Sequence, residues 1–208
     1  MSDFTEKMRL KGQADEDIYF ARRERELIEA LHRRRPPALR RVISGGQTGV
    51  DRGALDAVLA VGPEVGVAAG GWCPRGRLAE DGIIDGRYPL QETPLSDSAQ
   101  RTEWNVRDAD ATLLLCRGEP TGGSALTEQV AARLGKPLRR QALRPDSSEA
   151  AIAAIVAWLG REGVEVLNVA GPRESEAPGI GAEARTLLAA LLRAAGSGCE
   201  RPATGAAG

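Results

Sequence analysis

The segment Arg41–Asp51 reads RVISGGQTGVD and decides the fold. Its apolar start, Arg41–Ser44, predicts a strand, and Arg52–Val61 beyond it is an Ala- and Leu-rich predicted helix. The turn between them carries Gly45, Gly46 and Gly49, which let the backbone bend tightly and bring N–H groups close to an anion. The N-terminus of the following helix would add its positive dipole end. The turn is neither a Walker A loop nor G-x-G-x-x-G, so it indicates anion binding without naming the ligand.

Outward from this segment, short apolar runs alternate with helical stretches. Predicted strands are Pro63–Ala69, Ala111–Cys116, Leu138–Leu143 and Val164–Ala170; predicted helices are Gln100–Asp108, Thr127–Leu134, Ser147–Glu162 and Gly181–Ala194. Arg139 and Arg140 favour an edge position for their strand. This alternation predicts an α/β, Rossmann-like parallel sheet with helices on both faces.

Two further glycine-rich turns follow predicted strands. Gly122, Gly123 and Ser124 would open the helix that carries Thr127 and Glu128, and Gly171-Pro172-Arg173 ends the last strand. Ligands of such folds bind at the carboxyl ends of strands, and an arginine there can bind phosphate or carboxylate through two hydrogen bonds. Two anion-binding turns on neighbouring strands suit a ligand that carries phosphate. The predicted contacts in these turns and the first one are Gly45, Gly46, Gln47, Thr48, Gly49, Gly122, Gly123, Ser124, Thr127, Gly171 and Arg173.

The long stretch 70–110 is typical of a functional loop, because structureless loops of that length are uncommon in compact domains. Toward its end, Arg101, Asn105 and Asp108 fall on one face of a predicted helix. We add Arg101 and Asn105 to the predicted ligand contacts. Cys73 lies in the loop, where it could be an unliganded thiol or a ligand of a soft metal.

Composition excludes several classes of protein. With 28 Lys+Arg against 29 Asp+Glu and 3% aromatic residues, the chain lacks the basic excess and the stacking residues that favour nucleic-acid binding. A single histidine, His32, argues against a catalytic triad or a multi-histidine metal centre. The three cysteines form neither a disulfide framework nor a C-x-x-C site. We therefore predict no metal site.

The ends of the chain differ from its middle. Residues 1–38 form a charged extension in which Phe20, Leu27, Ile28 and Leu31 recur at helical spacing, so an amphipathic helix precedes the predicted sheet. Residues 39–195 are the predicted ligand-binding domain and 196–208 a flexible tail. The first residues have no signal-peptide pattern and no apolar run is long enough to cross a bilayer. We expect a cytoplasmic protein without a membrane partner.

Six segments in this order resemble the molybdenum carrier protein family, and the match runs from about Arg41 to about Leu192: SGGQTGVDRGALDA, GGWCPRGRLAEDG, YPLQET, RTEWNVRDADATLLL, TGGSALTE and LNVAGPRE. That family belongs to a wider Rossmann-like group with the Lonely-guy-type nucleotide phosphoribohydrolases, the lysine-decarboxylase-like proteins and the DNA-processing recombination mediators. The resemblance implies a nucleotide-like ligand or the molybdenum cofactor, a phosphate-bearing pterin, at the glycine-rich strand ends. It also implies a homodimer or homotetramer.

Two functions remain open from the sequence. The first is a carrier that holds molybdenum cofactor or a nucleotide without turnover. The alternative is an enzyme that hydrolyses the N-glycosidic bond of a nucleoside 5′-monophosphate, with Glu128 or Asp51 as the catalytic carboxylate. The hydrolases carry P-G-G-x-G-T-x-x-E; here Thr121 replaces the proline and Glu128 comes one residue early, a rotation of about 100° on a helix. Gly181 also stands where the hydrolase pattern leads us to expect an aromatic residue. A DNA-handling role is disfavoured by the charge balance.

Overall fold

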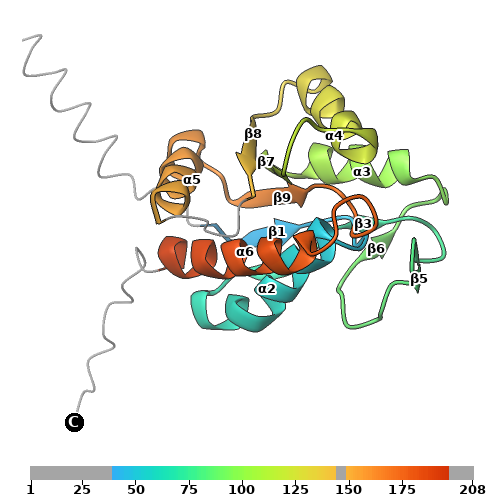
Figure 1. Ribbon diagram of the computed structural model, residues 1–208, viewed down its shortest axis with the longest axis horizontal. Helices are drawn as coiled ribbons and strands as arrows, with labels where there is room; N and C mark the ends of the chain where they lie inside the picture. The colour runs from blue at the N-terminus through green and yellow to red at the C-terminus, as the bar shows by residue number, and fades with distance from the viewer. Residues whose placement is uncertain (1–38, 144–148, 197–208) are drawn as a thin grey trace, which may run out of the picture. The chain divides into compact units, whose positions relative to one another are not determined.

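The computed structural model describes residues 39–143 and 149–196, and in this part a five-stranded parallel sheet forms the centre of the protein (Figure 1). Its strands are β1 (Arg41–Ile43), β2 (Ala68–Gly70), β7 (Ala111–Cys116), β8 (Leu138–Ala142) and β9 (Val166–Ala170). The order across the sheet is β2-β1-β9-β7-β8, and every neighbouring pair is parallel. The predicted Rossmann-like α/β class is therefore confirmed.

Burial and charge explain why β7 lies inside the sheet and β8 at its edge. All six residues of β7 are buried, as expected for a strand covered on both faces of a parallel sheet. At its centre, Thr112 lies opposite Asn168 of β9, and the Asn168 amide donates to the Thr112 hydroxyl at 3.2 Å. β8, with Arg139 and Arg140, lies at the edge of the sheet, where its charged side chains reach solvent.

The strand order becomes a familiar one when β9 is counted first. The sequence β9, β1, β2, β7, β8 then gives the order 3-2-1-4-5, which is the six-strand Rossmann order 3-2-1-4-5-6 without its last strand. In this chain the strand at the centre of the sheet is therefore the last one made, and α6 follows it. The crevice of a Rossmann fold lies where strand order reverses, which here is between β9 and β7.

Within residues 39–143 and 149–196, five helices accompany the sheet: α2 (Val50–Val65), α3 (Ser98–Asp108), α4 (Gly122–Arg133), α5 (Glu149–Glu162) and α6 (Ile180–Gly196). α2 packs along α6, and α6 against α5, on one face; α3 and α4 pack together on the other (Figure 1). The contact between α2 and α6 is close because glycines meet there. A Cβ on Gly53 would lie 2.2 Å from the carbonyl oxygen of Gly181.

The predicted elements exist, but several bounds differ. α2 continues through Pro63 to Val65, so of the predicted strand Pro63–Ala69 only the last two residues are strand, in Ala68–Gly70. Pro63 takes one N–H out of the last helical turn, and the helix ends soon after it, at Gly66 in the left-handed conformation. α4 begins five residues before the predicted start, at Gly122 itself. The N-terminal helix, the cap of α5 at residues 146–147 and the tail from residue 197 lie outside the described residues.

The long loop has a structure of its own. β3 (Trp72–Cys73) pairs with β6 (Gln91–Glu92), and β4 (Leu78–Ala79) forms a small hairpin with β5 (Gly82–Ile83). Arg77 holds these pieces together. Its guanidinium donates to four backbone carbonyl oxygens, those of Ile84, Asp85, Tyr88 and Leu90. One arginine thus satisfies backbone groups that a short strand pair cannot.

Among the described helices, none is both long and apolar enough to cross a membrane.

Candidate functional site

The turn after β1 uses much of its own hydrogen-bonding capacity. The N–H of Gln47 donates to Asp51 Oδ2 at 3.2 Å, the N–H of Thr48 to Gln47 Oε1 at 3.0 Å, and the N–H of Val50 to the Pro172 carbonyl at 3.2 Å. Gly49 has φ +73°, and a Cβ there would lie 2.5 Å from the Pro172 oxygen. The turn is therefore built to receive the loop after β9, and the protein's own groups occupy donors that the sequence suggested for an anion.

Asp51 is buried in the first turn of α2 and pairs with Arg101 of α3. Arg101 Nη1 lies 2.8 Å from Asp51 Oδ2, and the two side chains are 15% and 3% exposed. Burial raises the pKa of the Asp51 carboxyl above its ordinary value, while the Arg101 guanidinium and the Gln47 N–H oppose that rise. The pair joins the two faces of the sheet across Gly45.

A cavity of about 380 Å³, here called the polar cavity, lies beside this pair at the carboxyl end of β1. Its lining residues are Gly45, Gln47, Pro74, Leu78, Ala79, Glu80, Ser96, Asp97, Ser98, Arg101 and Arg173. Four of them, Gly45, Gln47, Arg101 and Arg173, are among the ligand contacts predicted from the sequence. The volume lies in the range of small-molecule sites.

Glu80 connects the hairpin to the sheet. Its carboxylate accepts hydrogen bonds from the hydroxyls of Thr48 and Ser175 and, at 3.2 Å, from the Ser175 N–H. The Glu80 N–H in turn donates to Gln47 Oε1 at 3.0 Å. Although burial opposes it, the hydrogen bonds from Ser175 and Thr48 lower the pKa of Glu80 below its ordinary value. We call this set of contacts the Glu80 latch.

A second, larger cavity of about 1080 Å³ lies against α2 and α6 and is open to solvent. Glu80 is the residue that lines both cavities. The latch therefore forms the wall between them.

The N-terminus of α4 differs from those of α3 and α6. Asp97 caps α3 by accepting from Ala99, and Glu174 accepts from the N–H of Gly181 at the start of α6. Thr121, at the cap of α4, makes no side-chain capping bond. A Cβ on Gly123 would meet nothing within 4 Å, so the backbone there faces open space. The N–H groups of Ser124 and Ala125 donate to the Thr121 carbonyl, at 3.0 and 3.2 Å, so the donors left for an anion are those of Gly122 and Gly123.

Ser124 adds a second feature to this turn. The residue is 3% exposed, and its hydroxyl oxygen has no hydrogen-bond partner in the described part of the chain. Thr127 is also buried, and its hydroxyl donates to the Gly123 carbonyl at 2.9 Å. A buried hydroxyl without a partner costs free energy, so Ser124 has unused hydrogen-bonding capacity at this turn.

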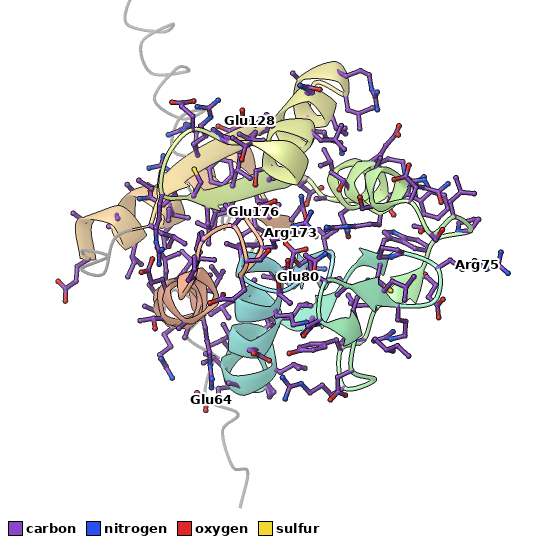
Figure 2. All side chains as sticks on the ribbon, turned by 45° about the vertical axis from the view of Figure 1, so that its right-hand side comes forward. Glu64, Arg75, Glu80, Glu128, Arg173 and Glu176 are labelled. Carbon is purple, nitrogen blue, oxygen red and sulfur yellow. The ribbon has the colours of Figure 1, made fainter. Side chains whose placement is uncertain are left out.

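Arg173 lies between the polar cavity and the α4 turn. Its Nε is 3.1 Å from Glu176 Oε1 and 3.9 Å from Glu80 Oε2. Glu176 Oε1 is in turn 3.8 Å from the position of a Cβ on Gly122. Figure 2 shows Glu80, Arg173 and Glu176 together near the centre of the molecule. The turns after β1, β7 and β9 therefore converge, as the three glycine-rich segments predict.

Glu128 lies away from this centre. Both of its carboxylate oxygens accept from Arg140 of β8, with 2.6 Å between Nη2 and Oε2. Arg140 also donates to Glu119 at 2.9 Å. Figure 2 places Glu128 apart from Glu80 and Arg173. Neither Glu128 nor Asp51 lines either of the two cavities.

The model of the circularly permutated YpsA SLOG family matches residues 42–192, which covers all five strands of the sheet from Val42 onward. The chain belongs to the circularly permuted YpsA SLOG family. The permutation in that name agrees with a strand order that becomes 3-2-1-4-5 when β9 is counted first.

One solved structure resembles this SLOG-family protein over most of its length. It is a protein named "Putative molybdenum carrier protein" from Syntrophus aciditrophicus SB, with 43% sequence identity and a TM-score of 0.68. The match covers 75% of this chain and 96% of the other. It supports the family resemblance that the sequence motifs indicate. No curated protein matches the chain.

Asn105 and Gly171, which the sequence also predicts as ligand contacts, make contacts within this SLOG-family protein. Asn105 accepts from the Trp72 N–H and donates to the carbonyls of Trp72 and Arg101, all at 2.9 Å. Asp108, on the same helix face, accepts from the Trp72 indole at 2.7 Å. Both residues brace the start of the long loop against α3. Gly171 packs tightly: a Cβ there would lie 2.3 Å from the Leu115 carbonyl oxygen.

Gly181 explains one departure from the hydrolase pattern. It lies where α6 touches the start of α2, and even a Cβ there would be 3.0 Å from the Gly49 oxygen. An aromatic side chain has no room at that position unless the helices separate.

Three residues of the site escaped the sequence reasoning, namely Glu80, Ser175 and Glu176. The signal for Glu80 was present, because the segment AEDG stands out in the long loop. Its partners are 32 and 95 positions away in the chain, so spacing alone could not join them.

Among the described residues, no three His, Cys, Asp or Glu side chains come together as a metal site. Cys73 and Cys116 are both buried free thiols, and burial raises the pKa of each.

Proposed function

We propose that this SLOG-family protein is a carrier that holds a phosphorylated small molecule, a nucleotide or the molybdenum cofactor, with the phosphate at the first turn of α4. The other end of the ligand would extend past Arg173 to the polar cavity. The ligand would then lie at the carboxyl ends of β9, β7 and β1, the position that strand order favours.

The observation that carries this proposal is the uncapped N-terminus of α4 together with the buried Ser124 hydroxyl that has no partner. Open backbone around Gly123 leaves room for phosphate oxygens. The N–H groups of the first turn and the helix dipole both favour a negative charge there. The donor set suits a phosphate, which both candidate ligands carry.

The surroundings of Glu128 and Asp51, the two candidate catalytic carboxylates, favour a carrier over a hydrolase. A general acid or base must reach the reacting atoms. Glu128 is held by Arg140 on the β8 side of α4, and Asp51 is buried beneath Arg101. The molybdenum carrier name of the similar protein supports the same choice and makes molybdenum cofactor one of the two ligands to test.

Mass spectrometry of the native protein tests the proposal. The protein is incubated with nucleoside monophosphates and with molybdopterin, and both bound ligand and released free base are measured. We expect retained ligand without base release. Release of free base by the wild type, but not by Glu128→Gln, would contradict the carrier function and establish the hydrolase.

A further inference from the structure

We propose that the polar cavity binds the ring end of the ligand, and that the Gln47 side-chain amide donates a hydrogen bond to a ring carbonyl oxygen. This inference rests on the proposed function, because the phosphate is assigned to the α4 turn. It names the ligand class more closely: a phosphorylated compound whose ring carries an oxo group facing the cavity.

The orientation of the Gln47 amide follows from its neighbours. Its Oε1 accepts from the Thr48 N–H and from the Glu80 N–H, each at 3.0 Å. Turning the amide over would place its NH₂ group against these two donors, so the contacts fix which end is the oxygen. Within the described ranges the Nε2 group donates to no protein atom. Gln47 lines the cavity, so its free N–H groups are available to a bound molecule.

The charges around the cavity argue against a second phosphate. Arg101 is neutralised by Asp51 at 2.8 Å, and Arg173 by Glu176 at 3.1 Å. Glu80 and Asp97 add two further carboxylates to the lining. An anionic group would have to displace one of these carboxylates, whereas a neutral carbonyl oxygen would not.

The opposite part of the lining suits a flat ring. Pro74, Leu78 and Ala79 are apolar residues of the cavity, and Leu78 is 52% exposed although it is a large hydrophobic side chain. Ile83 lies opposite Leu78 in the hairpin and is 76% exposed. Ile83 does not line the cavity, but burying Pro74, Leu78 and Ala79 against a ring would remove apolar surface from water.

Arg173 connects the two parts of the proposed site. It lines the polar cavity and reaches Glu176, which lies beside Gly122 at the α4 turn. A single ligand with a ring at one end and a phosphate at the other can therefore contact both places. Oxo-purine nucleotides and phosphorylated 4-oxo pterins share this chemistry.

Inosine and adenosine 5′-monophosphate form a matched pair of probes. They carry the same phosphate and ribose, but position 6 of the purine is an oxo acceptor in one and an amino donor in the other. A donor at Gln47 should favour inosine monophosphate by about tenfold, the value of one hydrogen bond that the competitor cannot make. A phosphorylated 4-oxo pterin is the third probe and distinguishes the pterin source.

Gln47→Glu is the decisive variant. In this variant one carboxylate oxygen still accepts from the N–H groups of Thr48 and Glu80. The other oxygen takes the place of the Nε2 amide, so an acceptor faces the cavity where the wild type has a donor. We expect a preserved melting temperature and an inverted preference, with adenosine monophosphate bound more tightly than inosine monophosphate. Gln91→Glu, the same change in charge at an exposed position outside the cavity, should leave the preference unaltered.

Equilibrium dialysis with each probe, and with inorganic phosphate, decides among the outcomes. Equal binding of the two purine nucleotides by the wild type, or an unaltered preference in Gln47→Glu, would overturn the assignment of Gln47. If the wild type binds the pterin but neither purine nucleotide, and Gln47→Glu no longer binds the pterin, the assignment of Gln47 is supported and the ligand is a pterin. Binding of inorganic phosphate but of no ring compound would overturn the ring site and leave only the assignment of a phosphate to the α4 turn standing. No binding of any probe would overturn the proposed function itself.

Discussion

The guanidinium of Arg101 covers Gly45 and donates from Nη1 to Asp51 Oδ2 at 2.8 Å. A Cβ on residue 45 would lie 1.6 Å from that nitrogen, so a larger residue there would have to push the guanidinium aside. The first glycine of the SGGQTG turn thus makes room for a side chain from α3, more than fifty residues along the chain. Among the described residues, Arg101 is the cation that balances the buried Asp51 carboxylate, which also accepts from the Gln47 N–H.

Arg101→Met should destabilise the protein by about 3 kcal/mol at neutral pH, because removing one partner leaves an uncompensated buried charge. Burial already raises the pKa of Asp51, and loss of Arg101 raises it further. In the pH range between the ordinary and the raised pKa, the native state binds more protons than the unfolded state, so stability falls as pH rises. Urea unfolding should therefore show a larger loss at pH 8 than at pH 5.

The double variant Asp51→Asn/Arg101→Met is the control for this prediction. It removes the charge together with its partner and should recover much of the lost stability with little dependence on pH. A pH-independent loss in Arg101→Met would mean that packing, and not the charge of Asp51, is responsible.

Gly53→Ala should separate α2 from α6. The added Cβ would lie 2.2 Å from the Gly181 backbone oxygen, which cannot rotate away as a side chain could. We expect a loss of about 2 kcal/mol from overpacking, measured as the free energy of unfolding. Gly123→Ala is the matched helical control: nothing lies within 4 Å, and it should be neutral or stabilising by up to about 1 kcal/mol. Equal effects of the two substitutions would refute the close helix contact.

Glu80→Ala should release the hairpin Leu78–Ile83 from the sheet. The variant loses the hydrogen bonds from Thr48 and Ser175, worth about 1–2 kcal/mol in total. Amide exchange and limited proteolysis should both become faster in the hairpin, with little change in β7. Because the pKa of Glu80 is lowered, its contribution to stability is fully present above the ordinary carboxyl range and is lost as pH falls through the lowered value. If amide exchange of the hairpin in Glu80→Ala is as slow as in the wild type, Arg77 alone holds the loop.

Glu128→Gln should leave ligand binding within about twofold of the wild type, since its carboxylate faces Arg140 and lines neither cavity. The effect on stability should be below about 1 kcal/mol, because the Glu128–Arg140 pair is partly exposed to solvent. Titration of the same phosphorylated ligand against both proteins is the measurement. A large loss of affinity would bring Glu128 back into the site.

Much of the fold could be predicted from local pattern. Apolar runs such as Ala111–Cys116 and the glycine-rich turns after them mark strands and crossovers. The order of the strands could not be predicted in this way, since it depends on which strand lies beside β9, and that is a long-range contact. The end of α2 was predicted too early, because proline usually ends a helix, whereas here the helix continues two residues beyond Pro63.

The candidate site, like the fold, could be predicted from the sequence only in part. The residue types at the turns were visible, but the sequence could not tell which N–H groups the protein uses itself. At the β1 turn, Asp51, Gln47 and Pro172 occupy donors, whereas at the α4 turn the backbone around Gly123 stays open. The two turns look alike as sequence, but at the β1 turn Asp51 and Gln47 fold back onto the backbone and the loop after β9 supplies Pro172.

Binding of a phosphorylated ligand to wild type and to Gly123→Asp tests the central claim most directly. An aspartate in the first turn of a helix is compatible with folding and would place its own carboxylate on the α4 donors. We predict an unchanged or higher melting temperature with at least a tenfold loss of affinity, while Gly86→Asp, at an open glycine of the long loop, retains wild-type affinity. Undiminished binding by a folded Gly123→Asp protein would contradict the assignment of the phosphate to α4.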